Sequence, residues 1–501
     1  MISTKTTLYN TNLLTFDHTE APLYDALCEY EKSKRISMHV PGHKDGRVFD
    51  EGALSHFSGI LGLDTTESVG IDDLHHPTDF IADAQNLAAE AFGADHTFFL
   101  VGGSTVGNLS IALSLCGPGD KILVQRNMHK SVFHGLLLAG AHPIFIAPAI
   151  ESTTKVAMVS DIAYIEKALM EHSDVKAVWI TNPNYYGMSK DISRLADTCH
   201  RHDIPLIVDE AHGAHFGQVE EVPPSALSKG ADIVVQSTHK MLTAMTMASM
   251  LHVKGNLVSR ERIAQVLGML QSTSPSYPLL ASLDVARRYL VTKGRSELKE
   301  TVKKLEERRV ALNQELKALS IWGGSEEIDR WDPLKWIISC KDEVATGYQL
   351  LDMFYEEGCT AEITDPRNIV FLFSIHEKEE NIDKVVAAIK AIDQKLETWT
   401  EEVVCNEDRE AVLFIEEGSL YKQNVSLRDA FHMPRKKVAI DKAVGKICGE
   451  MVIPYPPGIP LLTPGEEITA THIHSIKTLI EMGAYFQSPS DHSLEELYVL
   501  E

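Results

Sequence analysis

Short hydrophobic runs alternate with amphipathic segments between about residues 97 and 253. Seven of these runs have the length and apolar content of buried β-strands. They are Thr97–Val101, Lys121–Gln125, Pro143–Ala147, Ala177–Thr181, Pro205–Asp209, Ile233–Gln236 and Ser249–Val253. Between several of them, apolar residues recur at helical spacing, as in Asn108–Leu115 and Ile162–Glu171. Buried strands that alternate with helices predict an α/β fold whose mostly parallel sheet is covered by helices on both faces.

A different pattern begins after about residue 291. Residues Leu298–Leu319 are charged and amphipathic, and they predict one long helix. Strand Lys335–Ser339, helix Gly347–Glu357, strand Ile369–Ile375 and helix Ile382–Thr398 are predicted to follow it. This mixture of helices and strands predicts a small α+β domain.

These changes of pattern divide the chain into four parts. Residues 1–35 form an N-terminal segment, 36–295 a large domain, 296–400 the small domain and 401–501 a C-terminal domain. The last part contains Pro454–Pro460, whose proline and glycine content predicts an irregular loop. Several domains agree with a length of 501 residues, which exceeds what one simple hydrophobic core supports.

The formal net charge of −24 argues against nucleic-acid binding, which requires a basic surface. It favours cationic small molecules, although an acidic surface can also simply keep a protein in solution. No apolar run reaches the roughly 18 residues of a membrane span, and the first residues lack the apolar core of a signal peptide. The seven cysteines form no CxxC pair, which indicates reduced thiols in a cytoplasmic protein.

Residues suited to ligand binding follow five of the predicted strands. They are Gly102–Thr105, Gln125–His129, Asn182–Tyr186, Asp209–His212 and Ser237–Lys240. The carboxyl ends of parallel strands lie at one edge of a sheet, and ligands bind beyond that edge. We therefore expect these segments to form a common site.

Two of these residues have the chemistry that pyridoxal 5′-phosphate (PLP) requires. Lys240 can carry the aldehyde of the cofactor as a Schiff base. Asp209 can keep the pyridine nitrogen protonated, so that the ring accepts electrons. A single lysine after a strand is more often a solvated surface residue, so the prediction depends on the two residues together.

A glycine-rich segment offers a site for the cofactor's phosphate. It follows the strand Thr97–Val101 and opens a helix, where free N–H groups and the helix dipole favour an anion. Gly103 allows close approach of the backbone, and the hydroxyls of Ser104 and Thr105 are further donors. Ser237 and His239 can contribute from the neighbouring strand end, and the alternative is a turn that only caps the helix.

Three further features each allow two interpretations. His129 follows a strand and can stack on a planar cofactor, or it is a surface loop residue. Asn182 can donate a hydrogen bond to a cofactor's phenolic oxygen, or its Asn-Pro pair only sets a turn. His212 and His215 have a spacing found in metal sites, but Gly213 interrupts the helix that such a pair needs, and no HExxH motif is present.

Together these motifs closely resemble the Orn/Lys/Arg decarboxylase group of PLP fold type I enzymes. The resemblance covers nearly the whole chain and is to the shorter form, which lacks a receiver-like N-terminal domain. The motifs that carry it are Val40–Lys44, Leu74–Pro77, Gly119–Asp120, Asn127–Ser131, Asp209–His215, Ser237–Lys240, Ser274–Tyr277 and Pro454–Pro460.

The resemblance implies a role for each matching residue. As catalytic residues, Lys240 is expected to carry the cofactor, Asp209 to pair with its ring nitrogen and His129 to stack on its face. The residues expected to bind the cofactor are Gly103, Ser104, Thr105, His129, Asn182, Asp209, His212, Ser237, His239 and Lys240. His212 departs from the pattern, because longer relatives tend to carry Trp at this position.

The resemblance also implies a fold and a reaction. The fold is like that of aspartate aminotransferase, with a seven-stranded sheet in the large domain, a small α+β domain and a C-terminal extension. The reaction is decarboxylation of arginine or lysine, rather than ornithine, to an amine that feeds polyamine synthesis. The alternatives are another PLP reaction, such as aminotransfer or lyase chemistry, or a catalytically silent relative that binds a partner.

In fold type I enzymes the active sites lie at the interface of a homodimer or larger homo-oligomer, so the same is expected here. Ser274–Tyr277 and Tyr455 are candidates to border the substrate, or else they pack in the interface. The basic end of the substrate needs an acidic partner, for which Glu466, Asp284 and Asp365 all remain open.

Overall fold

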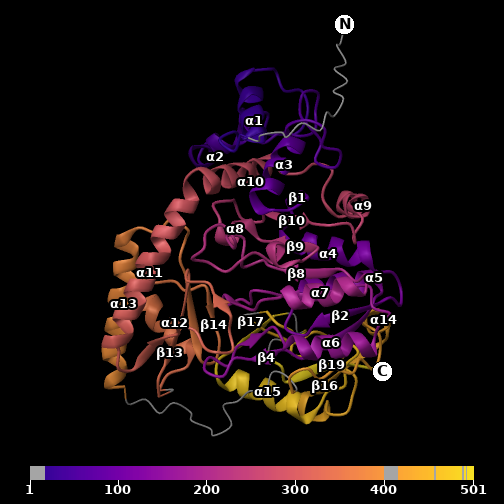
Figure 1. Ribbon diagram of the computed structural model, residues 1–501, viewed down its shortest axis with the longest axis vertical. Coiled ribbons are helices and arrows are strands. Elements are labelled where there is room, and N and C mark those ends of the chain that lie inside the picture. The colour runs from indigo at the N-terminus through magenta and orange to yellow at the C-terminus, as the bar shows by residue number, and fades with distance from the viewer. Residues whose placement is uncertain (1–16, 343, 400–415, 456–457, 488–489, 492) are drawn as a thin grey trace.

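A seven-stranded sheet forms the centre of the structure, which is a computed structural model describing residues 17–342, 344–399, 416–455, 458–487, 490–491 and 493–501 (Figure 1). Its strands follow in the order β1 (His96–Leu100), β10 (Ser249–Val253), β9 (Ile233–Gln236), β8 (Leu206–Asp209), β6 (Val178–Thr181), β2 (Lys121–Gln125) and β3 (His142–Ile146). Neighbours from β9 to β3 pair in parallel, whereas β10 is antiparallel to both its neighbours. The predicted mostly parallel sheet is confirmed.

Helices cover both faces of this sheet, because side chains of consecutive strand residues point to opposite faces. In β8, Ile207 packs with α4 (Gly103–Leu115), α5 (Lys130–Ala139) and α9 (Arg260–Leu270). Its neighbours Leu206 and Val208 pack with α6 (Ile162–Glu171) and α7 (Ser193–Arg201). The continuous apolar runs of the sequence are explained by this double burial.

The antiparallel strand β10 changes which residues meet at the sheet edge. Its amino end, rather than its carboxyl end, lies beside the carboxyl ends of β8 and β9. Ala248, just before β10, accepts a hydrogen bond from the backbone N–H of His239 at 3.1 Å. The start of β10 therefore supports the segment that follows β9.

The small domain contains a second, antiparallel sheet. Its strands follow in the order β11 (Leu319–Ile321), β13 (Lys335–Cys340), β15 (Asn368–Leu372) and β14 (Ile363–Thr364). Helices α11 (Arg295–Glu315), α12 (Gly347–Glu356) and α13 (Glu379–Glu397) pack with it, and α11 connects it to the large domain (Figure 1). This is the predicted α+β arrangement.

The predicted long helix ends earlier than expected. Helix α11 stops at Glu315, and Leu319 already belongs to strand β11. The carboxylate of Asp393 in α13 accepts hydrogen bonds from the backbone N–H groups of Lys317, Ala318 and Leu319, at 2.7–3.2 Å. These bonds hold the three N–H groups outside a helix, so the prediction of helix up to Leu319 was wrong.

The first and last described parts of the chain pack on opposite sides of the large domain (Figure 1). Helix α1 (Pro22–Lys32) lies against α3 (Phe80–Phe92) and α10 (Tyr277–Tyr289), and α2 (Leu54–Leu61) follows it. The C-terminal part lies beyond β3, joined to it by a bridge between Ile146 and Leu420. Its elements are α14 (Leu427–His432), β16 (Arg435–Ala439), β17 (Ile453–Tyr455), α15 (Ala470–Glu481), β18 (Tyr485–Gln487) and β19 (Glu496–Leu500).

The proline-rich segment of the C-terminal part begins as a strand, in contrast to the predicted irregular loop. Pro454 and Tyr455 belong to β17 and pair with β18. Residues 456–457 lie outside the described residues, as do 1–16 of the N-terminal segment and the predicted boundary near 401. Short paired strands complete the fold: β4 (Ala149–Ile150) with β5 (Ala157–Met158), and β7 (Met188–Ser189) with β12 (Arg330–Trp331).

Candidate active site

Lys240 lies in a single helical turn, α8 (Thr238–Met241), directly after strand β9. Three backbone bonds hold this turn: Lys240 N–H donates to Ser237 at 3.0 Å, Leu242 N–H to Thr238 at 2.8 Å, and His239 N–H to Ala248 at 3.1 Å. The His239 ring is also tied down, with Nδ1 3.0 Å from the carbonyl oxygen of Ala248. The lysine therefore leaves the sheet edge from a rigid turn.

The amine of Lys240 lies beside the rings of His212 and Tyr185. Its Nζ is 2.9 Å from Nε2 of His212 and 5.9 Å from the centre of the Tyr185 ring. Burial lowers the pKa of Lys240, and Asp209 and Glu362 oppose the change as negative charges. A lowered pKa leaves more of the amine unprotonated, which a nucleophilic lysine needs.

Asp209 ends strand β8 with a carboxylate that is only 3% exposed. It accepts hydrogen bonds from Asn108 Nδ2 at 3.0 Å and from the backbone N–H of Ala211 at 3.1 Å. Burial raises its pKa, since no ion pair to it occurs among the described residues. A buried carboxylate in this condition fits a protonated ring nitrogen, which would supply the missing positive charge.

His129 is held close to the same carboxylate by a chain of polar groups. It precedes α5 as its N-cap, and its Nδ1 lies 2.7 Å from Ser131 Oγ. Ser131 Oγ in turn accepts from Asn108 Nδ2 at 2.9 Å, and Asn108 binds Asp209. Burial, with the Lys240 charge next, lowers the pKa of His129 to about 3, so the ring is neutral and suited to stacking.

The segments predicted to bind the phosphate meet at the start of α4. Gly103 begins α4 with φ of +73°, a conformation that other residues rarely adopt, and its N–H donates to the Met247 carbonyl. Ser237 Oγ donates to Ser104 Oγ at 2.9 Å, so hydroxyls from two strand ends meet at the first turn of α4. Thr105 follows with an exposed side chain. A phosphate fits this combination of hydroxyls and helix N-terminus.

Asn182 and the two histidines of the metal alternative have other partners. The Asn182 amide binds both backbone groups of Lys190, each at 3.0 Å, which supports the conformational alternative for this residue. His215 Nε2 lies 3.0 Å from the buried Asp332, whereas His212 lies between two lysines. Among the described residues, no three metal-binding side chains come together.

The three carboxylates considered for the substrate's basic end all have partners away from Lys240. Glu466 binds Arg126, Asp284 binds Arg287, and Asp365 binds Tyr186 and Asn368. Glu362 is different, because it is exposed and acts electrostatically on Lys240, His239 and Lys335. Its position depends on the packing of the small domain against the large one, so the sequence did not point to it.

The predicted substrate-bordering segments lie near the site. Ser274 and Ser276 line a hollow of about 350 Å³ together with Gly102 and Thr105 of the phosphate site. Burial raises the pKa of the Tyr185 phenol, and Asp209 and Tyr455 add to the rise. Tyr455 of this same chain therefore lies within electrostatic range of the Lys240 surroundings.

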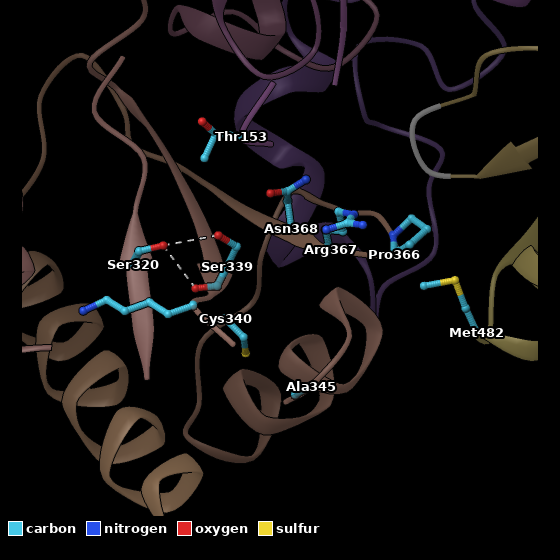
Figure 2. A pocket seen from close by; sticks show the side chains of 10 residues that line it. Thr153, Ser320, Ser339, Cys340, Ala345, Pro366, Arg367, Asn368 and Met482 are labelled. Carbon is cyan, nitrogen blue, oxygen red and sulfur yellow. Dashed lines mark hydrogen bonds between the residues drawn. The ribbon is translucent and has the colours of Figure 1, made fainter. Parts of the chain in front are cut away.

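A second hollow of about 170 Å³ lies elsewhere, between the small domain and the C-terminal part (Figure 2). Its lining includes Ser320 and Ser339, which are hydrogen-bonded to each other, and Met482 from beyond α15. None of the predicted site residues contributes to it. The cluster around Lys240 is therefore the candidate active site.

Besides Glu362, sequence reasoning missed three residues of this cluster: Asn108, Ser131 and Lys335. Ser131 lies inside the motif Asn127–Ser131, and Asn108 begins the predicted helical segment Asn108–Leu115, so their positions were a usable signal. Lys335 begins strand β13 of the small domain, and nothing in the sequence around it marked it.

Comparison with known proteins identifies the family of this chain. Residues 21–381 match the Orn/Lys/Arg decarboxylase major domain, and residues 419–487 match the C-terminal domain of that family. An arginine decarboxylase of Bacillus anthracis is 38% identical, covering 96% of this chain and 97% of its own length. Lysine decarboxylase LdcA of Pseudomonas aeruginosa is 27% identical, covering 93% of this chain and 76% of its own.

A solved structure shares the fold. The crystal structure of the Francisella novicida lysine decarboxylase LdcF superimposes with a TM-score of 0.80 at 21% identity, covering 96% of this chain and 81% of that chain. Of the described helices, none is both long and apolar enough to cross a membrane. The resemblance carried by the sequence motifs is confirmed, and PLP is the cofactor. The protein is an enzyme that decarboxylates a basic amino acid, and it belongs to the Orn/Lys/Arg decarboxylase family.

Proposed function

We propose that this enzyme decarboxylates arginine to agmatine and CO₂, and that the amine feeds polyamine synthesis. The relative named an arginine decarboxylase is 38% identical, whereas the one named a lysine decarboxylase is 27% identical. This difference supports arginine over lysine. The net charge of −24 suits a cationic substrate.

The roles proposed for the residues follow from their surroundings. PLP, when bound, supplies the ring that accepts the electrons of the breaking Cα–carboxylate bond. Lys240 would bind the cofactor's aldehyde, and its lowered pKa leaves more of its amine unprotonated and nucleophilic. Asp209 would hold a negative charge beside the ring nitrogen, and His129 would pack on the ring. Lys240 or His239 returns a proton to Cα.

For the phosphate we propose Ser104, Thr105, Ser237 and His239, with the N-terminus of α4 opened by Gly103. His212 contacts the cofactor beside Lys240. The proposal that Asn182 binds the phenolic oxygen is weaker, because its amide already binds Lys190.

The observation that carries the proposal is the pair formed by Asp209 and Lys240. A buried carboxylate without a counter-ion among the described residues ends β8, and an amine of lowered pKa follows the adjacent parallel strand β9. This combination suits a cofactor with a ring nitrogen and an aldehyde, and it argues against a catalytically silent relative.

The test is CO₂ release from carboxyl-labelled arginine, lysine and ornithine. We expect kcat/KM for arginine to exceed that for lysine by at least about tenfold, or about 1.4 kcal/mol. A higher value for lysine or ornithine would contradict the substrate assignment. Keto-acid formation without CO₂ would instead indicate an aminotransferase.

We also propose a homodimer or larger homo-oligomer with its active sites at the interface. Four apolar side chains near the Val40–Lys44 motif support this, because each is more than 60% exposed: Ile36, Met38, Val40 and Val48. Light scattering on the purified enzyme tests it. We expect at least twice the chain mass of 55.6 kDa, and an active species of 55.6 kDa would contradict it.

A cytoplasmic location is proposed as well. The cysteines of the described residues are all free thiols, which suits a reducing compartment. We also propose the division into residues 36–295, 296–400 and 401–501; the separate family matches over 21–381 and 419–487 support only the C-terminal boundary. Fractionation of cells would test the location, and limited proteolysis would test the domain boundaries.

A further inference from the structure

A buried lysine, Lys335, lies on the other side of His212 from Lys240. Lys335 begins β13 and is only 4% exposed. Its Nζ donates to the carbonyl oxygen of Tyr185 at 2.9 Å and lies 3.2 Å from Nδ1 of His212. The other ring nitrogen of His212, Nε2, lies 2.9 Å from Nζ of Lys240. The imidazole therefore connects two lysine amines.

The His212 ring is held in this bridging position. It packs against the Tyr185 ring with centres 4.9 Å apart, and it is 5% exposed. Gly187 leaves room for the second lysine, because a side chain there would meet Lys335 Cδ at 3.1 Å and Asp332 Cβ at 2.7 Å. The bridge is thus built into the contact between the two domains.

Charged and titratable groups lie around the contacts that join Lys240, His212 and Lys335. His212 faces Lys240, Lys335, His129 and His239, while Lys335 also faces Asp332 and Glu362. Burial lowers the pKa of His212 well below its usual range. Burial also lowers the pKa of Lys335 to about 8, against the opposing charge of Asp332. At neutral pH the ring is therefore neutral and Lys335 is protonated.

The positions of the protons follow from these contacts. A protonated lysine has only donors, so Lys335 donates to Nδ1 of His212. A neutral imidazole carries one proton, which must then be on Nε2, facing Lys240. Only an unprotonated amine has the lone pair to accept this proton in a hydrogen bond.

We infer that Lys335 is a positioning residue that acts through His212 to keep the amine of Lys240 unprotonated and nucleophilic. Its charge sets which nitrogen of His212 carries the proton, and that proton favours the neutral form of Lys240. The inference rests on the role proposed for Lys240, but its test needs no substrate and no cofactor.

The experiment measures the reactivity of Lys240 in the cofactor-free, full-length protein. Cyanate reacts with unprotonated amines, and mass spectrometry of the Lys240 peptide gives the rate at each pH. Lys335→Met keeps the size and removes the charge. We expect the apparent pKa of Lys240 to rise and the rate at pH 7.5 to fall about threefold to tenfold.

Two control variants separate charge from packing. Lys335→Arg retains a protonated donor and should keep the rate within about twofold of the wild type. Lys341→Met, just beyond the other end of β13, should leave it unchanged. An unchanged rate in Lys335→Met overturns the inference, as does a Lys335→Arg protein as slow as Lys335→Met.

A change at His212 tests the connection itself. His212→Leu removes both ring nitrogens, so it should slow the reaction by itself and reduce the effect of adding Lys335→Met. Equal effects of Lys335→Met in both backgrounds would overturn the role of His212. If Lys335→Met does not fold, an unchanged rate in His212→Leu alone overturns it. Release of CO₂ by the wild-type enzyme is a separate measurement, so failure of the proposed function is distinguishable.

Discussion

Two buried groups of charged residues in this molecule are arranged in opposite ways. Between the large domain and the C-terminal part, Arg126 Nη2 donates to Glu466 Oε2 at 3.0 Å, and both side chains are almost fully buried. The guanidinium also lies within 5.5 Å of the rings of Phe133, Phe145 and Tyr421. Here each charge faces its opposite.

Around Lys240 the charges are not paired. Two lysines share one histidine, and Asp209 forms no ion pair among the described residues. The pKa values of both lysines are lowered and that of Asp209 is raised, in each case mainly by burial. The comparison indicates that paired buried charges hold domains together, whereas unpaired ones are set for chemistry.

The largest expected effect tests the active-site half of this comparison. Lys240→Ala removes the amine that binds the cofactor, so we expect kcat to fall by at least about 10³. The visible absorbance of the cofactor-loaded enzyme should disappear as well. Steady-state kinetics and absorption spectra measure both, with circular dichroism as the control for folding. Turnover at the wild-type rate would refute the assignment of Lys240.

The next largest effect tests the buried ion pair between Arg126 and Glu466. Glu466→Gln leaves the Arg126 charge buried without its partner, which should cost about 3–5 kcal/mol of stability. Urea unfolding measures the loss, while kcat of the folded enzyme should change little. The double variant Arg126→Met/Glu466→Leu replaces the pair by apolar groups and should recover most of the loss. A cost below about 1 kcal/mol would remove the distinction between the two groups.

A smaller effect is expected at the carboxylate of the active site. Asp209→Asn keeps the shape and a partner for Asn108 but removes the negative charge. We expect kcat to fall about a hundredfold, or about 2.7 kcal/mol, because the ring nitrogen loses its counter-charge. Stability should rise or stay the same, since an unpaired buried charge is removed. A strong loss of stability with little loss of kcat would mean that Asp209 stabilises the fold rather than serving the chemistry.

The smallest effect concerns acid stability. Burial lowers the pKa of His252 to about 3 in the folded protein, below the ordinary value of 6.5. The unfolded chain therefore binds the extra proton, so this stability is present above pH 6.5 and is lost as the pH falls towards 3. Between pH 7.5 and 5.5, wild type should lose about 1 kcal/mol more than His252→Gln. Equal losses in urea titrations at the two pH values would contradict this.

The strands and the main site residues were predictable from local pattern. Lys121–Gln125 and Ile233–Gln236 have the predicted bounds, because consecutive apolar residues in a strand are buried on both faces of the sheet. Lys240 and Asp209 were placed together because parallel strands end at one edge. The roles of the individual site residues stay predictions until the variants are measured.

Other features depended on residues far away in the sequence. The end of α11 is set by Asp393, more than seventy residues later, through bonds to Lys317, Ala318 and Leu319. The amide of Asn182 is occupied by Lys190 rather than kept for a ligand. Hydrophobic periodicity contains no information on either contact.

The sequence by itself determined the α/β architecture, the family and the amine at the end of β9, because burial patterns and turn chemistry are properties of neighbouring residues. Only the tertiary structure decided which charges are paired. Lys335 and His212 are 123 positions apart, and they meet because the small domain packs against the carboxyl edge of the large sheet. The electrostatic state of a buried amine depends on all the groups around it, and folding alone brings those groups together.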